Sequence, residues 1–498
     1  MLHRVLIELH VRRAIRSRVP FLHHTAALSP SGPAVEVSNT RRRLGMAALL
    51  IAAAFMAADV TITNVALPTI AAELDAPMSS LQWVVDSYNI TVAGLLLLGA
   101  GLGERFSRKG TFLAGITLFL VGSAMAGLAN SVGLLVTART VTGIGGAIAL
   151  APAISLITMM YVPDQRAKAV AAWSAAGSLG LALSPIAAGA ILTVASWNWA
   201  FLINVPAMIA IIVLGVLALP PGRNPKANRL DVTGAILSVL GLGLVLGAVI
   251  EAPTLGWTDP VIILAGTAGL IASVAFVFWE LHRPEPMFEV RVLVRPGVLG
   301  ASLALFASFI AFAGSIFLIA QDLQVVNGVT PMQLGMCLVP FAVGVWLASH
   351  EAARIARAIG AAATLSIGMG LVVLAFAGLA VSAPWQSIGA IVTASFICAL
   401  GCGLLFPIGS VIILNDLPAE LTGTASGTSM LARMAGASFG VAVLGTVVAV
   451  NLGPGYAHAD PEAFAQGMQL AYWAGALLLL AIGLGQGVAL ARWKDPNR

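Results

Sequence analysis

Charged residues are scarce in this chain of 498 residues: 26 are Lys or Arg and 21 are Asp or Glu, together 9% of the total. Ordinary soluble domains carry roughly a quarter charged residues. Because 59% of the residues are apolar, the chain has more hydrophobic surface than the layered packing of a soluble fold can bury. The composition therefore excludes a soluble enzyme and indicates a polytopic membrane protein.

Cysteine and catalytic motifs are scarce as well. Cys337, Cys398 and Cys402 all lie in apolar stretches, which excludes a secreted disulfide framework. Cys398 and Cys402 share a helical face, and we expect them to pack rather than to bind metal. No histidine falls within an apolar run, and no G-x-x-x-x-G-K-[S/T] motif occurs. We therefore expect no enzyme activity, no ATP hydrolysis, no cofactor and no metal site.

Long apolar runs dominate the sequence instead. A membrane-spanning helix needs about 20 mostly apolar residues, and fourteen such runs lie between residues 44 and 490. They lack the alternating pattern of barrel strands, so we predict an all-α integral membrane protein. The tenth run, Leu334 to Ser349, is the shortest and is closed by His350 and Glu351.

The Lys and Arg residues orient these spans. When the loops are assigned to alternating sides of the membrane, all Lys and Arg outside the spans fall on one side, here called the basic side. The positive-inside rule places the basic side, and with it both termini, in the cytoplasm. We expect the plasma (inner) membrane as its location. The net charge of +5 is thus a topology signal, and we expect no nucleic-acid binding.

Ionisable residues within spans are costly and are functional candidates. Asp59, Asp86 and Arg139 fall in the first, second and fourth spans, and Asp59 lies roughly 24 Å from the basic end of its span. We expect the three to share a cavity, because they lie at similar depth and consecutive spans tend to be neighbours. Carboxylates raise each other's proton affinity and an arginine lowers it, which is the chemistry of proton-coupled transport. Two alternatives remain: Asp59 and Arg139 form a permanent helix staple, or Asp86 reaches water at the outer rim.

Four other ionisable residues lie in or beside spans. Asp322, near the outer end of the ninth span, belongs either to the membrane interface or to the transport path. Arg433, in the thirteenth span, is expected to pack against helix carbonyls. Glu251 and Glu280 fall at span ends, where we expect them to be solvated.

The runs around these residues resemble a known family. The run from Asp59 to Pro68 is similar to the D-x-T-I-x-N-V-A-L-P of the fourteen-span drug:proton antiporters of the major facilitator superfamily. The run from Trp83 to Tyr88 resembles the W-I-V-D-x-Y of QacA-type quaternary-ammonium efflux pumps, whereas many relatives have Thr at the position of Asp86. This resemblance implies a cationic substrate.

Further motifs carry the same resemblance. The loop from Ala100 to Lys109 is similar to G-x-L-x-D-R-x-G-R-K, with departures that put the tight gating turn in question. The run from Arg139 to Gly146 resembles R-x-x-Q-G-x-G and implies that Arg139 takes part in proton transfer. The run from Trp197 to Pro206 resembles the W-R-W-x-F-x-I-N-x-P that opens the sixth span. The gating-loop residues are Glu104, Arg105, Arg108 and Lys109, of which Glu104 is expected to cap the neighbouring helix. The antiporter motif G-x-x-x-G-P-x-x-G-G is matched by Gly180, Ser184, Pro185 and Gly189.

The resemblance implies the major facilitator fold, with substrate bound between two six-helix bundles that rock around it. We expect a proton-coupled antiporter, a monomer in the lipid bilayer, that exports lipophilic cationic drugs such as quaternary ammonium compounds and dyes. The alternative is an exporter of an endogenous metabolite, antibiotic or lipid precursor, and a remoter one is a non-transporting receptor. The expected substrate-binding residues are Asp59, Asp86, Trp83, Tyr88 and Asp322. The expected divisions are a basic segment (1–43), a first bundle (44–219), a linker with two extra spans (220–297), a second bundle (298–491) and a tail (492–498).

Overall fold

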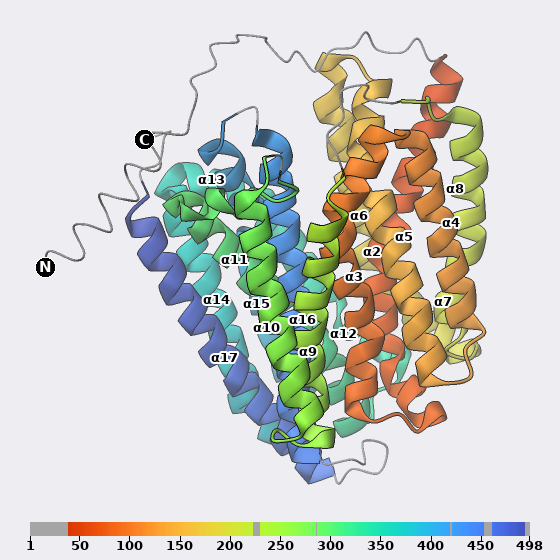
Figure 1. The fold of residues 1–498 in the computed structure, drawn as a ribbon. Coiled ribbons are helices and arrows are strands. Elements are labelled where there is room, and N and C mark those ends of the chain that lie inside the picture. Colours follow the sequence, from red (N-terminus) through yellow and green to blue (C-terminus); the bar gives the residue numbers. More distant parts are fainter. Residues whose placement is uncertain (1–37, 223–229, 285, 419–420, 453–460, 494–498) are drawn as a thin grey trace, which may run out of the picture. The chain divides into compact units, whose positions relative to one another are not determined.

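The computed structural model describes residues 38–222, 230–284, 286–418, 421–452 and 461–493, and every regular element in these ranges is helical (Figure 1). Most of the predicted basic segment and of the tail lies outside the described residues. The elements are α2 (Asn39–Leu74), α3 (Met78–Arg105), α4 (Arg108–Gly127), α5 (Val132–Met160), α6 (Pro163–Val194), α7 (Trp199–Leu202), α8 (Asn204–Ala218), α9 (Val232–Leu255), α10 (Pro260–His282), η1 (Val290–Val294), α11 (Pro296–Gln321), η2 (Asp322–Val326), α12 (Pro331–Cys337), α13 (Val339–Ile359), α14 (Ala361–Ser382), η3 (Ala383–Trp385), α15 (Ile388–Asp416), α16 (Thr422–Leu452) and α17 (Pro461–Ala491).

Helix length and hydropathy give 14 candidate membrane spans in the described residues. This confirms the predicted all-α membrane protein and its number of spans. The tenth span was predicted too short, because it runs over Pro331–Ile359. His350 and Glu351 lie inside α13 rather than closing it. Glu351 accepts from Arg354 one helical turn later at 2.8 Å, so polar side chains continue this helix past its apolar part.

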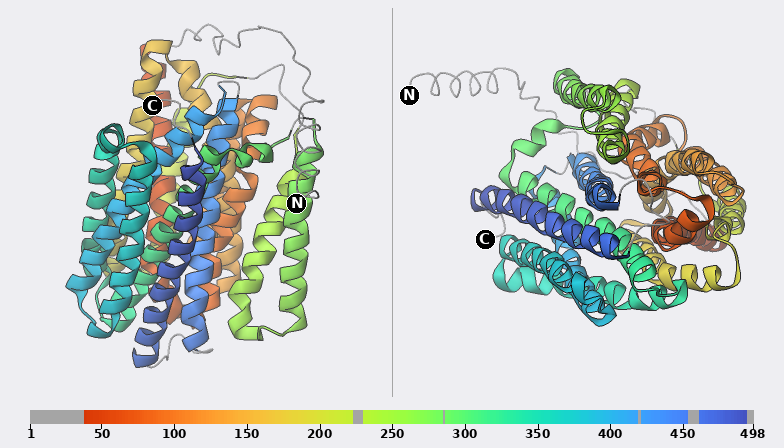
Figure 2. Two further views of the ribbon diagram at one scale, coloured as in Figure 1. Left: turned by 90° about the vertical axis from the view of Figure 1, so that its left-hand side faces the viewer. Right: turned by 90° about the horizontal axis from the view of Figure 1, so that it is seen from below.

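The contacts between helices form two groups and a separate pair. Helices α2 to α8 contact one another, with α2 against α6 and α8, and with α5 against α3 and α4. Helices α11 to α17 form the second group, in which α11 contacts α15, α16 and α17. The pair α9 and α10 packs together, and α9 also touches α3 of the first group and α16 of the second (Figures 1 and 2). Contacts of α3 with α16, and of α6 with α12, join the two groups directly.

Polar side chains fix the ends of the α9–α10 pair. Asp231 caps α9 by accepting from Gly234 N at 2.8 Å, and it also accepts from Trp279 Nε1 at 3.0 Å. The carboxylate of Glu280 is buried and accepts from the backbone N of Phe288 at 3.1 Å. Glu251 is half-buried and accepts from Trp83 Nε1 of α3 at 2.8 Å. The expectation that both glutamates are solvated was therefore wrong, because neighbouring elements close over these span ends.

Candidate functional site

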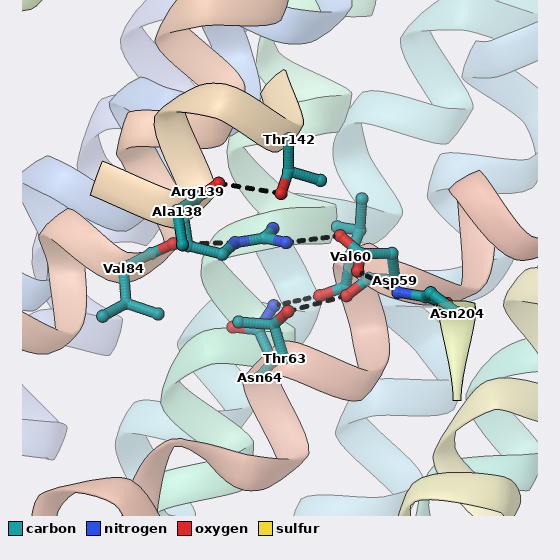
Figure 3. A network of polar contacts seen from close by, with 9 residues as sticks. All are labelled: Asp59, Val60, Thr63, Asn64, Val84, Ala138, Arg139, Thr142 and Asn204. Carbon is teal, nitrogen blue, oxygen red and sulfur yellow. Dashed lines mark hydrogen bonds and ion pairs between the residues drawn. The ribbon is translucent and has the colours of Figure 1, made fainter. Parts of the chain in front are cut away.

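The centre of the first helical group holds a buried carboxylate with two partners. Asp59 of α2 is 1% exposed, and its Oδ2 accepts from Nη1 of Arg139 on α5 at 2.6 Å. Its Oδ1 accepts from Nδ2 of Asn204, the first residue of α8, at 2.8 Å. Figure 3 shows Asp59 between these two side chains. Three helices that are far apart in the sequence therefore meet at one carboxylate.

Arg139 makes further contacts with α3 and α7. Its Nε donates to the backbone oxygen of Val84 at 3.2 Å (Figure 3). Its guanidinium carbon lies 4.6 Å from the ring centroid of Tyr88 and 5.8 Å from that of Phe201. Such cation–π contacts are worth roughly 2 kcal/mol or more when desolvated. A buried charge is tolerated only when it is paired and hydrogen-bonded, and this ion pair meets both conditions.

Asp86 does not join this pair. Residues i and i+2 of a helix point about 200° apart, so the α3 face that offers the Tyr88 ring to Arg139 is opposite to the face of Asp86. Asp86 shares its face with Gln82, whose Nε2 donates to the backbone oxygen of Ala442 on α16 at 2.8 Å. Asp86 is 0% exposed, and within the described residues neither carboxylate oxygen has a well-formed hydrogen bond, although the amide of Asn89, three residues later on α3, is close enough to interact with it. The structure thus separates the two carboxylates and buries Asp86 between α3 and α16, away from an outer rim.

The two aromatic residues expected to bind substrate, Tyr88 and Trp83, both contact other parts of the protein. Tyr88 is 3% exposed and lies beneath Arg139. Trp83 points toward α9, where it packs against Gly247 and donates to Glu251. Tyr88, two residues after Asp86, lies on the opposite face of α3, whereas Trp83, three residues before Asp86, lies on a neighbouring part of the same face with its indole directed to Glu251 of α9.

Asp322 lies inside the second helical group. It begins the π-helical segment η2 and is 4% exposed. Its Oδ2 accepts from the hydroxyl of Tyr472 on α17 at 3.1 Å, and its Oδ1 accepts from Asn327 Nδ2 at 3.4 Å. Asp322 is therefore enclosed by the protein and is not a solvated residue of the surface. Two residues later, Gln324 donates to the backbone oxygen of Val65 on α2 at 3.0 Å, so this segment also touches the helix of Asp59.

The predicted gating loop is a two-residue turn between α3 and α4. Phe106 and Ser107 have φ of −101° and −167°, so the missing glycines are not needed for a positive φ. Ser107 caps α4 by accepting from Gly110 N at 3.1 Å. Glu104, expected to cap the neighbouring helix, is exposed, as is Arg105. Arg108 contacts Met159 Sδ, and Lys109 Nζ donates to Val216 O at 2.6 Å, so both basic side chains hold the turn against α5 and α8.

The predicted antiporter motif places α6 between the two helical groups. A Cβ on Gly180 would overlap the backbone oxygen of Ala54 on α2, and one on Gly189 would lie 2.6 Å from the backbone oxygen of Pro331 on α12. Ser184 is buried and donates to Leu181 O at 2.8 Å. Pro185 lies inside α6, where a proline leaves one backbone carbonyl without its usual donor. The motif therefore allows close backbone approach on both sides of α6.

This packing gives a direct stability test. In Gly180→Ala the new methyl group meets backbone, so α2 and α6 must separate, and we expect a loss of about 1–3 kcal/mol. The matched control is Gly370→Ala in α14, where a Cβ meets nothing within 4 Å. There the better helix propensity of Ala should stabilise by about 1 kcal/mol. Thermal unfolding of the two purified variants measures the difference, and equal midpoints would contradict the close approach of α2 and α6.

Some site residues were not identified from the sequence. Asn204 was seen only as part of a resemblance, although a lone amide at the start of an apolar helix could have marked it as a partner. Gln82 was missed because a residue near a span end looks solvated. The expected carbonyl contact of Arg433 is present: its Nη2 donates to Phe406 O at 3.3 Å.

Comparisons with known proteins identify the family of this chain and several drug-export relatives. The family model of the Major Facilitator Superfamily matches residues 49–441. The multidrug resistance protein Stp of Mycobacterium tuberculosis (strain CDC 1551 / Oshkosh) is 30% identical over 79% of this chain and 73% of its own length. The multidrug efflux pump LfrA of Mycolicibacterium smegmatis is 30% identical over 83% of this chain and 82% of its own. The tetracenomycin C resistance and export protein of Streptomyces glaucescens is 29% identical over 85% and 80%.

Solved structures support the fold. An inward-facing bacterial homologue of the human lysosomal transporter Spinster aligns with a TM-score of 0.66 at 16% identity, covering 92% of this chain and 100% of that one. The POT family transporter PepTSo aligns with a TM-score of 0.66 at 16% identity, covering 90% and 99%. At these identities the likeness concerns the fold alone.

Proposed function

Because this chain belongs to the Major Facilitator Superfamily, we propose that it is a proton-coupled antiporter that exports lipophilic cationic drugs, such as quaternary ammonium compounds and dyes. The observation that carries the proposal is the separation of two buried carboxylates by α3. Asp59 is held by Arg139 and Asn204, whereas Asp86 has no well-formed hydrogen bond among the described residues. In this proposal the paired carboxylate exchanges the proton and the unpaired carboxylate attracts the cation, so the two sites need different environments.

Asp59 and Arg139 form the proton-coupling unit in this proposal. When Asp59 takes a proton, its attraction to Arg139 falls, and the guanidinium is left with Val84 O and the ring of Tyr88. Because a lone buried charge is unfavourable, protonation favours a rearrangement of α2 against α5. A local proton event thereby changes helix packing, which is the coupling that an antiporter requires.

Asp86 is the proposed cation site. A carboxylate between apolar helices attracts a cation strongly because few other groups compete for its charge. Its face of α3 meets α16 across the junction of the two helical groups, which is where substrates of this architecture are expected to bind. The names of Stp and LfrA support multidrug export, while the cationic preference rests on Asp86. The name of the Streptomyces glaucescens relative keeps antibiotic export as the second candidate.

The proposal includes the membrane, the orientation and the oligomeric state of the protein. We propose a monomer in the plasma (inner) membrane with the basic side and both termini in the cytoplasm. The bundles 44–219 and 298–491 would alternate access by rocking, with 220–297 attached to them through α9. Each pH unit supplies about 1.4 kcal/mol per proton, and 100 mV supplies about 2.3 kcal/mol per charge. Exchange of one proton for one monocation would use only the pH difference, and two protons would also use the voltage.

Everted membrane vesicles test the proposal. With a pH gradient established, adding a quaternary ammonium cation should release protons from vesicles that contain the protein and not from vesicles that lack it. If no lipophilic cation moves protons while the protein is inserted and folded, the cationic reading is wrong. An uncharged or anionic metabolite then becomes the leading substrate.

A further inference from the structure

The second helical group contains an arginine without an acidic partner. Nη2 of Arg433 on α16 donates to Ser410 Oγ at 2.7 Å and to Phe406 O at 3.3 Å, both on α15. Its Nε has no hydrogen-bond partner within the described residues. No carboxylate of the described chain lies within ion-pair distance of it. Since arginine stays protonated in proteins, this is a permanent, uncompensated positive charge.

The charge lies at membrane depth. The span of α16 runs over Thr424–Leu452, so its middle is near residue 438, and Arg433 lies about 8 Å from that middle. This is well inside a hydrocarbon core of about 30 Å. A guanidinium facing lipid there would be strongly unfavourable. Because Arg433 is nevertheless half-buried rather than fully buried, its accessible part must face the interior of the protein.

The neighbours of Arg433 support an interior surface. Helix α11 is buried almost throughout, and Phe309 is one of the few half-buried residues in its middle. The guanidinium carbon lies 5.6 Å from the ring centroid of Phe309 and 5.9 Å from that of Phe406. The two rings lie 4.7 Å apart with an interplanar angle of 36°. Arg433 therefore lies at the edge of a half-buried aromatic wall.

This surface lies near the junction with the first helical group. Met434, the next residue of α16, packs against the apolar cluster of the first group. Helices α3 and α16 run antiparallel, with Gln82 bonded to Ala442 and Leu97 against Gly427. With these pairings Asp86 is level with about residue 438 of α16. Arg433 then lies roughly 7.5 Å farther along the axis toward the basic side.

We propose that Arg433, with Ser410, Phe309 and Phe406, forms a second substrate subsite that binds an ionised oxygen carried on a planar aromatic compound. The guanidinium is a planar fork that matches a carboxylate and is weakly hydrated, and the two phenylalanine rings offer a stacking surface. The inference rests on the export function proposed above and deepens it. With a carboxylate at Asp86 and a cation at Arg433, the transporter accepts aromatic zwitterions as well as simple cations.

A purely structural role explains less of the geometry. A staple between α16 and α15 needs only the two bonds of Nη2, and a neutral amide could make them without burying a charge. Nε is enclosed without an acceptor within the described residues, and the hydrogen bonds that the guanidinium makes there all come from Nη2. Unused donors beside an aromatic wall are the arrangement expected of a ligand site.

The test uses one dye in two forms, a rhodamine as its free carboxylate and as its methyl ester. Both carry the same cationic ring system, so only the acidic oxygen differs. Initial uptake rates are measured in everted vesicles with a pH gradient. We expect wild type to transport both forms. Arg433→Gln should lower the rate for the free carboxylate by about tenfold or more while leaving the ester rate within about twofold. Arg433→Lys keeps the charge but loses the planar fork, so its rate for the free carboxylate should lie between those of wild type and Arg433→Gln.

Ser410→Ala provides an independent variant, since it removes the hydroxyl that orients Nη2 and leaves the charge in place. Ser410→Ala should also slow transport of the free carboxylate and not of the ester. If Arg433→Gln is not recovered in the membrane, this variant alone tests the subsite. Equal losses for both dye forms, no change for either, or transport of the ester alone by wild type would each overturn the subsite. If wild type moves neither form, the export function itself fails.

Discussion

Replacing Asp59 with Asn should abolish proton-coupled export and also lower the stability of the folded protein. The substitution leaves the Arg139 guanidinium buried without the carboxylate that holds it at 2.6 Å. Breaking one side of a buried ion pair costs about 3–5 kcal/mol. Thermal unfolding of the purified variant and proton release from everted vesicles measure the two effects. Unchanged proton release in Asp59→Asn would contradict its assignment as the proton carrier.

The double variant Asp59→Asn/Arg139→Gln distinguishes a role in proton coupling from a purely structural link between α2 and α5. Both side chains are then neutral and keep hydrogen-bonding groups, so most of the lost stability should return through the interaction between the two sites. Proton coupling should not return, because no titratable group remains at this position. If the double variant regains both stability and coupling, the pair is a helix staple and the proton must travel by another carboxylate.

The span count could be predicted because it depends on the length of the apolar runs, while the sidedness of the loops stays a prediction. Long apolar runs give the spans, and the positions of Lys and Arg give their alternation. The boundary of the tenth span could not be predicted in the same way. His350 and Glu351 look like loop residues, but α13 continues through them because a helix can extend beyond the lipid into water.

The side chains that meet at the site were harder to predict than their depth. The depth of Asp59, Asp86 and Arg139 follows from counting residues, but helix rotation decides which of them meet. Asp86 and Tyr88 are two residues apart, and only Tyr88 faces Arg139. A sequence also gives no sign that Phe288 folds back over Glu280. Placing such side chains requires the packing of elements that are distant in the chain.

The largest effect on substrate choice is expected at Asp86. In Asp86→Asn we expect the export rate of a quaternary ammonium cation to fall roughly 10- to 100-fold, because a cation 4 Å from a carboxylate gains up to about 4 kcal/mol at an effective dielectric constant of 20. An uncharged analogue of the same shape, with carbon in place of the quaternary nitrogen, should be exported at the wild-type rate. Asp86→Glu keeps the charge and should retain most of the cation transport.

The stability of the same variant should move in the opposite direction to that of Asp59→Asn. Asp86 has no well-formed hydrogen bond within the described residues, so its replacement leaves no buried charge unpaired and removes one that is unfavourable to bury. The unfolding midpoint of Asp86→Asn should therefore equal or exceed that of wild type. A lower midpoint together with equal losses for the cation and its uncharged analogue would mean that Asp86 supports packing between α3 and α16. Selective loss of the cation at unchanged or higher stability would identify Asp86 as the group that selects charge.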